Sequence, residues 1–344
     1  MLISMNNRDC LALAEPAVKS NTSSRIVDSL VDSSILITGA TGFVGRNLLF
    51  LLECIRNEFG IKYEIDILKR ANSPSSLIAY RQVGEVVWNA NEKFFLKREY
   101  DYVFHLANDN SNLSNNTFNA VNSVSFKILE SLFASLGQQE AKCSFNLASS
   151  GAVYGHIGIK DSVSGKFEEN SQLNSETLTH YGKVKLFCEN WANQNKPENL
   201  NLSVSRMFSF YGPHLPVSQN FAIGNFFRDV IQSRDIIIEG CGLSLRSYLS
   251  SYDLALALLK IATSGFSGPV NVGSDRAISI LELADIFCAQ SKSTKWVLSS
   301  DEKSESTYVP DTKILKDEIG FCETIGLEDG ISKWLTCAGV KRKQ

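Results

Sequence analysis

Three glycines spaced three residues apart follow a short apolar run in the first part of the chain. The segment ILITGATGFVG, residues 35–45, places Gly39, Gly42 and Gly45 between a strand-like stretch and a helix-like one. Glycines permit a tight turn and let the backbone approach a pyrophosphate, whose charge is then stabilised by the N-terminus of the following helix. The strand-to-helix context separates such a loop from an ordinary glycine-rich turn. We therefore predict that the chain binds NAD(H) or NADP(H).

Strand-like and helix-like runs alternate downstream of this loop. The strand-like runs are ILIT, YEIDIL, VVW, DYVFHLA, CSFNLAS and LSVSRMF, with helical periodicity between most of them. This alternation predicts an α/β fold, a Rossmann-type doubly wound parallel sheet with helices on both faces.

The regular alternation ends after Tyr211, and a later helix-like and strand-like pair is expected to return to the sheet. We expect an interleaved organisation with a smaller C-terminal substrate lobe. Its parts are an N-terminal extension at 1–33, a dinucleotide-binding domain at 34–210 completed by about 251–274, and a substrate-binding lobe at 211–250 and 275–344.

Composition favours a small-molecule partner. With 34 basic and 37 acidic residues the net charge is -3, which does not suggest a nucleic-acid or membrane surface. The eight cysteines are scattered singly, as expected of thiols in a reducing cytoplasm, and their spacing predicts no metal site. No apolar run approaches the ~18 residues that span a bilayer.

Candidate catalytic side chains lie on two of these runs. Tyr181 and Lys185 are four residues apart, so they share one face of the predicted helix. A cation beside a phenol favours phenolate, which suits proton exchange with a substrate hydroxyl. Upstream, FNLASSGAVYG places Ser149 and Ser150 at the carboxyl end of a strand, where ligands bind in parallel sheets.

This set of motifs resembles the extended short-chain dehydrogenase/reductases, and within them the NAD-dependent epimerase/dehydratase family, which acts on nucleotide sugars. Thr38 leads a TGxxGxxG loop, and Ser150, Tyr181 and Lys185 follow in the order of the family's catalytic triad. The resemblance implies catalytic roles for these three. The cofactor-binding residues implied are Thr38, Gly39, Thr41, Gly42, Phe43, Val44, Gly45, Lys69, Arg70, Leu106, Ala107, Asn122, Tyr181 and Lys185.

The second half of the chain resembles the nucleotide-sugar branch of that family. SRMFSFYGPH is similar to an RxxNxYGP segment with Ser209 replacing the usual Asn, and YVPDTKIL places Tyr308 where an Arg would help bind the nucleotide. The resemblance implies a nucleoside-diphosphate sugar as partner and a homodimer. The substrate-binding residues implied are Ser149, Ser209, Asn225 and Arg246.

The choice of cofactor depends on the end of the second strand. An acidic residue there favours NAD and a basic one accommodates the 2′-phosphate of NADP. The chain has Lys69 and Arg70 at this point, which favours NADP(H), although the nearby Asp66 keeps NAD(H) open and a solvated basic turn is the alternative reading.

The residues after Ser150 restrict the reaction. Gly151 and Ala152 stand where the resemblance places Asp-Glu in 4,6-dehydratases and a Glu in most decarboxylases. Because neither can move a proton, we expect an epimerase acting at C4, with an NADPH-dependent 4-keto-sugar reductase as the alternative. A non-catalytic NADP sensor is a third possibility that the intact triad disfavours.

Overall fold

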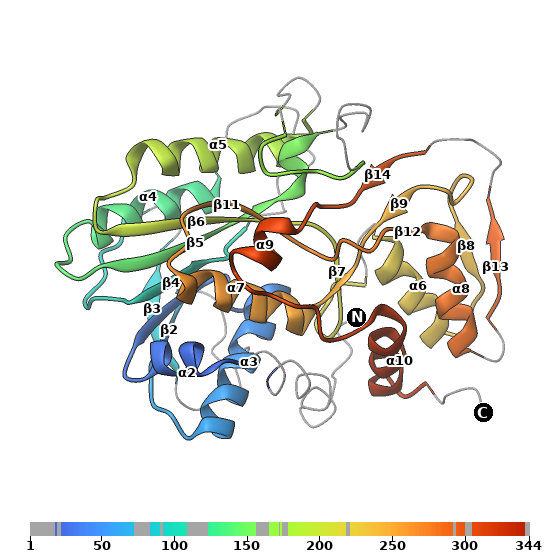
Figure 1. Cartoon of the computed structure of the whole chain (residues 1–344), viewed down its shortest axis with the longest axis horizontal. Coiled ribbons are helices and arrows are strands. Elements are labelled where there is room, and N and C mark those ends of the chain that lie inside the picture. The colour runs from blue at the N-terminus through green and yellow to red at the C-terminus, as the bar shows by residue number, and fades with distance from the viewer. Residues whose placement is uncertain are drawn as a thin grey trace.

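The computed structural model describes residues 18, 22–71, 83–89, 92–108, 123–155, 165–171, 173, 178–217, 221–291, 294–299 and 305–340. A seven-stranded parallel sheet forms the larger of two lobes (Figure 1). The strands run in the order β11-β6-β5-β4-β1-β2-β3. Their bounds are β1 Ser34–Thr38, β2 Glu64–Arg70, β3 Val83–Trp88, β4 Tyr102–His105, β5 Cys143–Ser150, β6 Leu200–Met207 and β11 Gly268–Val272.

The order of the sheet reverses between β1 and β4. Chain connections leave β1 towards β2 on one side, whereas β4, β5 and β6 follow on the other. Every pair in this sheet is parallel. The reversal opens a crevice at the carboxyl ends of the strands, which is where such sheets bind ligands. The predicted doubly wound Rossmann fold is confirmed.

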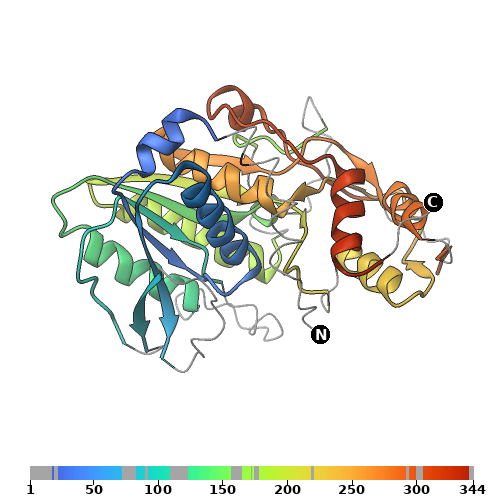
Figure 2. The ribbon, with the colours of Figure 1, turned by 90° about the horizontal axis from the view of Figure 1, so that it is seen from below.

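Helices cover both faces of the sheet (Figures 1 and 2). One face carries α4, Val124–Leu136, and α5, His180–Asn195, over a core of strand and helix side chains. The other carries α3, Phe43–Phe59, and α7, Ser251–Ser264. Buried apolar side chains on both faces account for the continuous apolar runs of the strands.

A further helix, α2, Ser24–Leu30, lies within the predicted N-terminal extension. Its Ile26 and Leu30 are buried in the same core as α3 and α7. Arg25 donates to the carbonyl oxygen of Ser264 at 2.9 Å, at the end of α7. This part of the extension therefore packs onto the sheet lobe.

The smaller lobe combines helices with short strands, which in the described part of the chain form two pairs and one three-stranded sheet in the order β12-β9-β14. Its elements are β7 Phe210–Tyr211, α6 Ala222–Ile231, β8 Ile236–Ile238, β9 Leu245–Arg246, β10 Leu249–Ser250, β12 Ile278–Ser279, α8 Ile280–Gln290, β13 Trp296–Leu298, β14 Thr307–Tyr308 and α10 Leu327–Cys337. Phe227 of α6 stacks on Trp334 of α10, with ring centroids 3.7 Å apart. This lobe has a hydrophobic core of its own.

The last part of the chain is shared between the lobes. The short helix α9, Lys313–Asp317, contributes Leu315 to the core of the sheet lobe, as do Ile319 and Phe321 after it. Part of the segment 275–344, which the sequence assigns to the substrate lobe, thus contributes to the core that also contains residues of α7 and β11. α10 then rejoins the smaller lobe.

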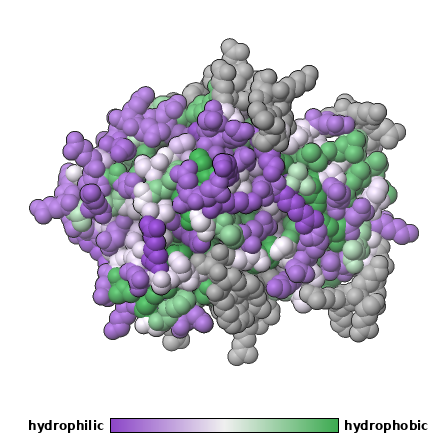
Figure 3. All heavy atoms as spheres, viewed as in Figure 1, coloured by the Kyte–Doolittle hydropathy of each residue, from purple (hydrophilic) through white to green (hydrophobic). Residues whose placement is uncertain are grey.

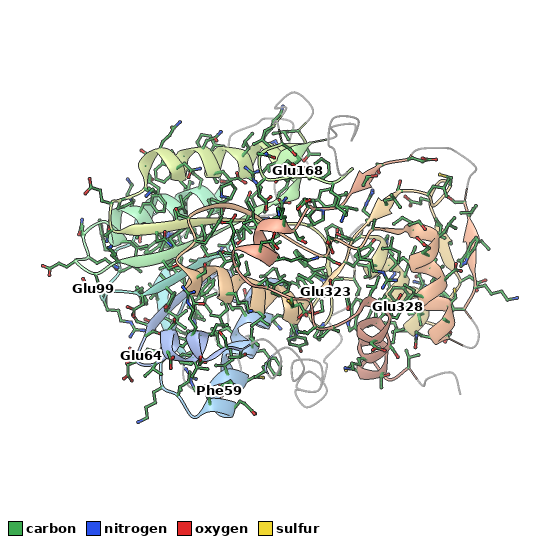
Figure 4. All side chains as sticks on the ribbon, viewed as in Figure 1. Phe59, Glu64, Glu99, Glu168, Glu323 and Glu328 are labelled. Atoms are coloured by element: carbon green, nitrogen blue, oxygen red, sulfur yellow. The ribbon has the colours of Figure 1, made fainter. Side chains whose placement is uncertain are left out.

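The two ends of the sheet differ in their surroundings. Figure 4 places Glu64 and Glu99 at the end of the sheet farthest from the smaller lobe, where β2 and β4 begin. The carboxyl ends of the strands consequently face the smaller lobe. On the face shown in Figure 3, hydrophobic residues gather mainly over that lobe. Among the described residues, no helix is long and apolar enough to cross a membrane.

Candidate functional site

A cavity of about 1000 Å³ lies at the carboxyl ends of the strands and extends into the smaller lobe. It brings together most of the residues that the sequence predicts for the site. Those that line it are Gly39, Thr41, Gly42, Phe43, Val44, Gly45, Lys69, Arg70, Leu106, Ala107, Tyr181, Lys185, Ser209, Asn225 and Arg246. Thr38, Ser149 and Ser150 are not among its lining residues, and Asn122 lies outside the described part of the chain.

The glycine loop is packed so closely that side chains would not fit. Gly39 has φ +68°, and a Cβ atom on it would lie 2.7 Å from the backbone nitrogen of Ala107. A Cβ on Gly45 would lie 2.5 Å from the carbonyl oxygen of Gly39. Gly42 is the N-cap of α3. The loop thus presents backbone and the N-terminus of α3 to the cavity, which fits the pyrophosphate of a nicotinamide dinucleotide.

Thr38 is hydrogen-bonded to residues at the end of β4, next to the glycine loop. Its hydroxyl lies 2.8 Å from Nδ1 of His105 and accepts a hydrogen bond from the backbone N–H of Ala107 at 3.1 Å. Nε2 of His105 lies 3.0 Å from the carbonyl oxygen of Ser125, which can only accept, so Nε2 carries the proton and Nδ1 accepts from Thr38. Thr38 and His105 thus fix the ends of β1 and β4 without lining the cavity.

His105 is expected to make stability depend on pH. Burial, reinforced by the Lys185 ammonium and opposed by the bond to Ser125, lowers its pKa to about 3. Between the folded pKa and the unfolded pKa of about 6.5, His105 is protonated in the unfolded chain and neutral in the folded one. The contribution of His105 to the free energy of unfolding is therefore fully present above pH 6.5 and decreases as the pH falls. From pH 6.5 to 5 the loss from this group should be about 2 kcal/mol in urea unfolding. A His105→Asn variant should lack this part of the pH dependence of its free energy of unfolding. An equal dependence on pH in the variant and the wild type would contradict the lowered pKa of His105.

The end of β2 presents basic residues to the cavity. Lys69 forms an ion pair with Glu85 at 2.9 Å, and Arg70 is exposed at the cavity wall. Asp66, the acidic residue that left the cofactor open, does not line the cavity. It accepts hydrogen bonds from Arg98 at 2.8 Å and Tyr100 at 2.6 Å.

Tyr181 and Lys185 lie on one face of α5, as predicted, and both line the cavity. The Lys185 ammonium is 5.9 Å from the centre of the Tyr181 ring and donates to the carbonyl oxygen of Ala148 at 2.8 Å. A Cβ on Gly182 would lie 2.5 Å from the carbonyl oxygen of Ala152, so α5 packs directly on the turn that follows β5. This close packing brings Tyr181 to the carboxyl end of β5.

Ser150 ends β5 and caps the following 3-10 helix η3, Gly151–Tyr154. Its hydroxyl accepts a hydrogen bond from the backbone N–H of Ala152 at 3.2 Å, and the residue is 7% exposed. Ser149, one residue earlier, points elsewhere: its hydroxyl bonds to the buried carboxylate of Glu189 on α5. Ser149 is therefore held by α5, whereas Ser150 caps the turn on which α5 packs, and neither lines the cavity.

Arg206, from the RxxNxYGP-like segment, is also held inside the protein. Its guanidinium donates to Glu189 at 2.8 Å, and both side chains are nearly inaccessible, at 7% and 4%. It also donates to the Tyr154 hydroxyl at 3.1 Å. The bonds to Glu189 outweigh burial and raise the pKa of Arg206 further above its usual range. This buried pair ties β6 to α5, the helix that carries Tyr181.

The smaller lobe supplies the far wall of the cavity. Asn225 lies on α6 and Arg246 on β9, both lining it. The Arg246 guanidinium donates to the carbonyl and hydroxyl oxygens of Ser306, each at 3.0 Å. A guanidinium suits a diphosphate because its planar donors match phosphate oxygens.

Two aromatic residues beside Gly151, Phe208 and Tyr308, were not predicted as site residues. Phe208 lines the cavity, and the ring of Tyr308 packs against that of Phe208 at a tilt of 38°, with ring centroids 4.7 Å apart. Tyr308 reaches this place because β14 pairs with β9 in parallel, opposite Arg246. The sequence marks Tyr308 only because it replaces the Arg of the RxPD-like segment. That replacement does not predict where the Tyr308 ring lies.

Comparison with known proteins agrees with this geometry. The profile described as NAD dependent epimerase/dehydratase family matches residues 35–273. The chain belongs to this family. Its members depend on NAD(P), so the predicted NAD(H) or NADP(H) cofactor is confirmed at that level.

The known proteins that are similar to this chain are named for several different reactions. The chain is 23% identical over 303 residues to UDP-glucuronic acid decarboxylase 1 of Danio rerio, covering 87% of this chain and 71% of that protein. The UDP-glucose 4-epimerase of Thermotoga maritima, solved with UDP-glucose, has a TM-score of 0.70 at 19% identity, covering 88% and 98%. The dTDP-glucose 4,6-dehydratase of Bacillus anthracis, solved with NAD, has 0.67 at 17%, covering 89% and 96%.

Proposed function

We propose that the protein is a nucleoside-diphosphate-sugar epimerase that works by hydride transfer at a sugar carbon, C4, with Tyr181 as acid and base. The observation that carries this proposal is the content of the cavity described above. It joins the glycine loop, the Tyr181–Lys185 pair and the Arg246 wall. Among the described lining residues the single carboxylate is Glu239, an exposed residue of the smaller lobe.

The residues that line the cavity support a reaction that needs only a phenol, a hydroxyl and a hydride carrier. Elimination of water or loss of CO₂ in this family uses a carboxyl group after the catalytic hydroxyl, by the resemblance described above. Here Gly151 and Ala152 occupy those positions. The proposal therefore favours epimerisation over the reaction of the decarboxylase relatives.

The roles of the chain's own residues follow from their places. Tyr181 takes the proton of the C4 hydroxyl as hydride leaves C4, which yields a 4-keto sugar, and returns a proton when hydride returns to the opposite face. Lys185 holds its charge near the phenol, and Ser150 donates a hydrogen bond to the reacting oxygen. Arg246 and Asn225 bind the diphosphate. A nicotinamide held at the glycine loop would store the hydride between the two transfers.

The second candidate, an NADPH-dependent 4-keto-sugar reductase, is favoured by the end of β2. Arg70 is exposed at the cavity wall, Lys69 is beside it, and Asp66 is occupied by Arg98 and Tyr100. A cationic wall there suits a 2′-phosphate. A reductase consumes its reduced cofactor once per turnover, whereas an epimerase regenerates it.

Replacement of Arg70 by serine is expected to weaken NADPH binding about tenfold and to leave NADH binding unchanged, because only NADPH offers a charged 2′ group. Fluorescence titration of each nucleotide measures both affinities. Lys62→Ser removes an exposed cation just before β2, far from the cavity, and should change neither. An equal loss for NADH and NADPH would contradict a 2′-phosphate contact.

The proposed function is tested by incubating the enzyme with a panel of nucleoside-diphosphate hexoses and 4-keto sugars, with absorbance at ~340 nm and product analysis. A C4 epimer formed without net change in absorbance supports the epimerase. Net oxidation of NADPH selects the reductase. A pentose with release of CO₂, or a 4-keto-6-deoxy product from an unmodified hexose, would refute both candidates.

A further inference from the structure

A buried side chain on α3 connects the helix of the glycine loop to the turn that leads into the smaller lobe. Asn47 is 1% exposed. Its amide nitrogen donates to the carbonyl oxygen of Phe43 at 2.8 Å and to that of Pro213, 166 residues later, at 3.1 Å. Phe43 is the first residue of α3 and lines the cavity. Asn47 thus joins the glycine-loop end of the cavity to a distant segment of the chain.

The turn that contains Pro213 holds its backbone in uncommon conformations. Gly212 has φ +133°, which glycine adopts readily, and His214 has φ +70°, where a side chain is strained. Strain of this kind persists where the surrounding contacts hold the backbone in place, and it gathers at functional sites. The bond from Asn47 reaches the carbonyl oxygen between these two residues. Asn47 therefore holds the centre of a strained turn.

The residues that follow this turn belong to the cavity wall. Leu215 and Pro216 both line the cavity. The backbone N–H of Leu215 donates to the carbonyl oxygen of Gly212 at 3.2 Å, and its side chain packs on the core of the smaller lobe. The conformation of the turn consequently decides where this part of the wall lies.

Helix α7 completes the junction from the other side. The Ser251 hydroxyl donates to Oδ1 of Asn47 at 2.9 Å, so the Asn47 amide uses both of its donor hydrogens and its acceptor. A Cβ atom on Gly212 would collide with Oγ of Ser251. Ser251 begins α7 directly after β10, which pairs with β7. The outgoing and returning crossings between the lobes therefore meet at Asn47.

A junction of this kind makes the order of two cavity walls interdependent. The first turn of α3 belongs to the wall that we assign to the dinucleotide, and the turn after β7 leads into the wall of the smaller lobe. A first ligand that orders one wall also orders the other through the Asn47 bonds. The second ligand then pays less of the ordering cost, and the effect is reciprocal.

We propose that Asn47 is a positioning residue that couples binding of the dinucleotide to binding of the nucleotide sugar, an inference that rests on the proposed function. Asn47 is not among the residues that line the cavity. It acts through Phe43 on one side and through the turn at Pro213 on the other. Its loss should therefore weaken the dependence of one ligand on the other more than it weakens either ligand alone.

Ligand titration of the full chain tests this coupling without turnover. UDP, dTDP and GDP are titrated to find one that binds, and its Kd is then measured with and without saturating NADPH or NADH. In the wild type the dinucleotide should lower this Kd about tenfold, or ~1.4 kcal/mol. Asn47→Ala should reduce the effect to less than about twofold. The Kd of the dinucleotide alone should stay within about threefold, because the backbone of the glycine loop carries that contact.

Ser251→Ala is a milder test of the same junction. It removes one of the three hydrogen bonds of the Asn47 side chain and leaves both bonds to backbone carbonyl oxygens. The coupling should fall to about threefold to fivefold. Combined with Asn47→Ala, the Ser251→Ala substitution should cause no further loss of coupling, because the two residues act through one bond.

Asn146→Ala is the matched control. Asn146 is fully buried, and its amide nitrogen donates to the hydroxyls of Ser203 and Ser205 within the sheet lobe. This variant should keep the coupling of about tenfold even where its unfolding midpoint falls as far as that of Asn47→Ala. With the sugar found active in the panel, Asn47→Ala should raise KM about tenfold and leave kcat within about twofold, because Tyr181 lies on α5.

The outcomes separate this inference from the proposed function. A wild-type chain that binds no dinucleotide, or none of the three diphosphates, would refute both. Binding of the two ligands without mutual effect would overturn the inference alone, as would full coupling in Asn47→Ala. Equal loss of coupling in Asn146→Ala would assign the effect to a general loosening of the fold and would also overturn it. Should Asn47→Ala fail to fold, unchanged coupling in Ser251→Ala decides against the inference.

Discussion

Tyr181→Phe is expected to slow turnover by about 10²–10⁴-fold, the usual contribution of a positioned acid and base. The substitution removes only the hydroxyl of a side chain that lines the cavity beside the buried Lys185. Binding of the dinucleotide should remain within about twofold, because the glycine loop and the N-terminus of α3 carry most of that contact. Steady-state rates and a nucleotide titration on the same preparation separate the two effects.

Tyr102→Phe is the matched control. Tyr102 lies on β4, and its hydroxyl donates to the carbonyl oxygen of Ser29 at 3.1 Å, outside the cavity. Its loss should leave kcat unchanged. A Tyr181→Phe enzyme of unchanged rate would remove the proposed acid and base from the mechanism.

Glu189→Gln should destabilise the fold by about 3–5 kcal/mol, because it leaves the Arg206 charge buried without a counter-charge. Both side chains are almost completely inaccessible, and Glu189 also accepts from Ser149. Because the pair ties β6 to α5, the variant should lose this stability throughout the sheet lobe. Urea unfolding monitored by far-UV circular dichroism measures the change.

Glu328→Gln is the comparison on the surface. Glu328, at the start of α10 (Figure 4), pairs with Arg276 while both side chains are about half exposed, at 49% and 54%. Such pairs contribute less than about 1 kcal/mol. Equal losses in the two variants would show that burial does not govern the Glu189–Arg206 pair.

The features predictable from sequence were those that depend on neighbours along the chain. The glycine spacing set the β1 turn and the start of α3, and the spacing of Tyr181 and Lys185 placed both on one face of α5. The alternation of runs predicted the strands of the sheet because strand and helix have different hydrophobic periods.

The features that could not be predicted depend on contacts between distant residues. Thr38 bonds to His105 across 67 residues, and Ser149 bonds to Glu189 across 40. The sequence places both side chains at strand ends, but it does not show which partner each hydroxyl has in the folded chain. Tyr308 comes to lie beside Gly151 and Phe208 through the pairing of β14 with β9, which no local pattern indicates.

The order in which the chain crosses between the lobes has a consequence for folding. The sheet lacks its last strand, β11, and its central buried helix, α7, until the chain has passed through α6, β8 and β9 of the smaller lobe. On the return path, Asp253 of α7 accepts hydrogen bonds from Thr324 and from the Ile325 backbone, at the entry to α10. We therefore expect the two lobes, and with them the walls of the cavity, to fold and unfold together in one cooperative transition.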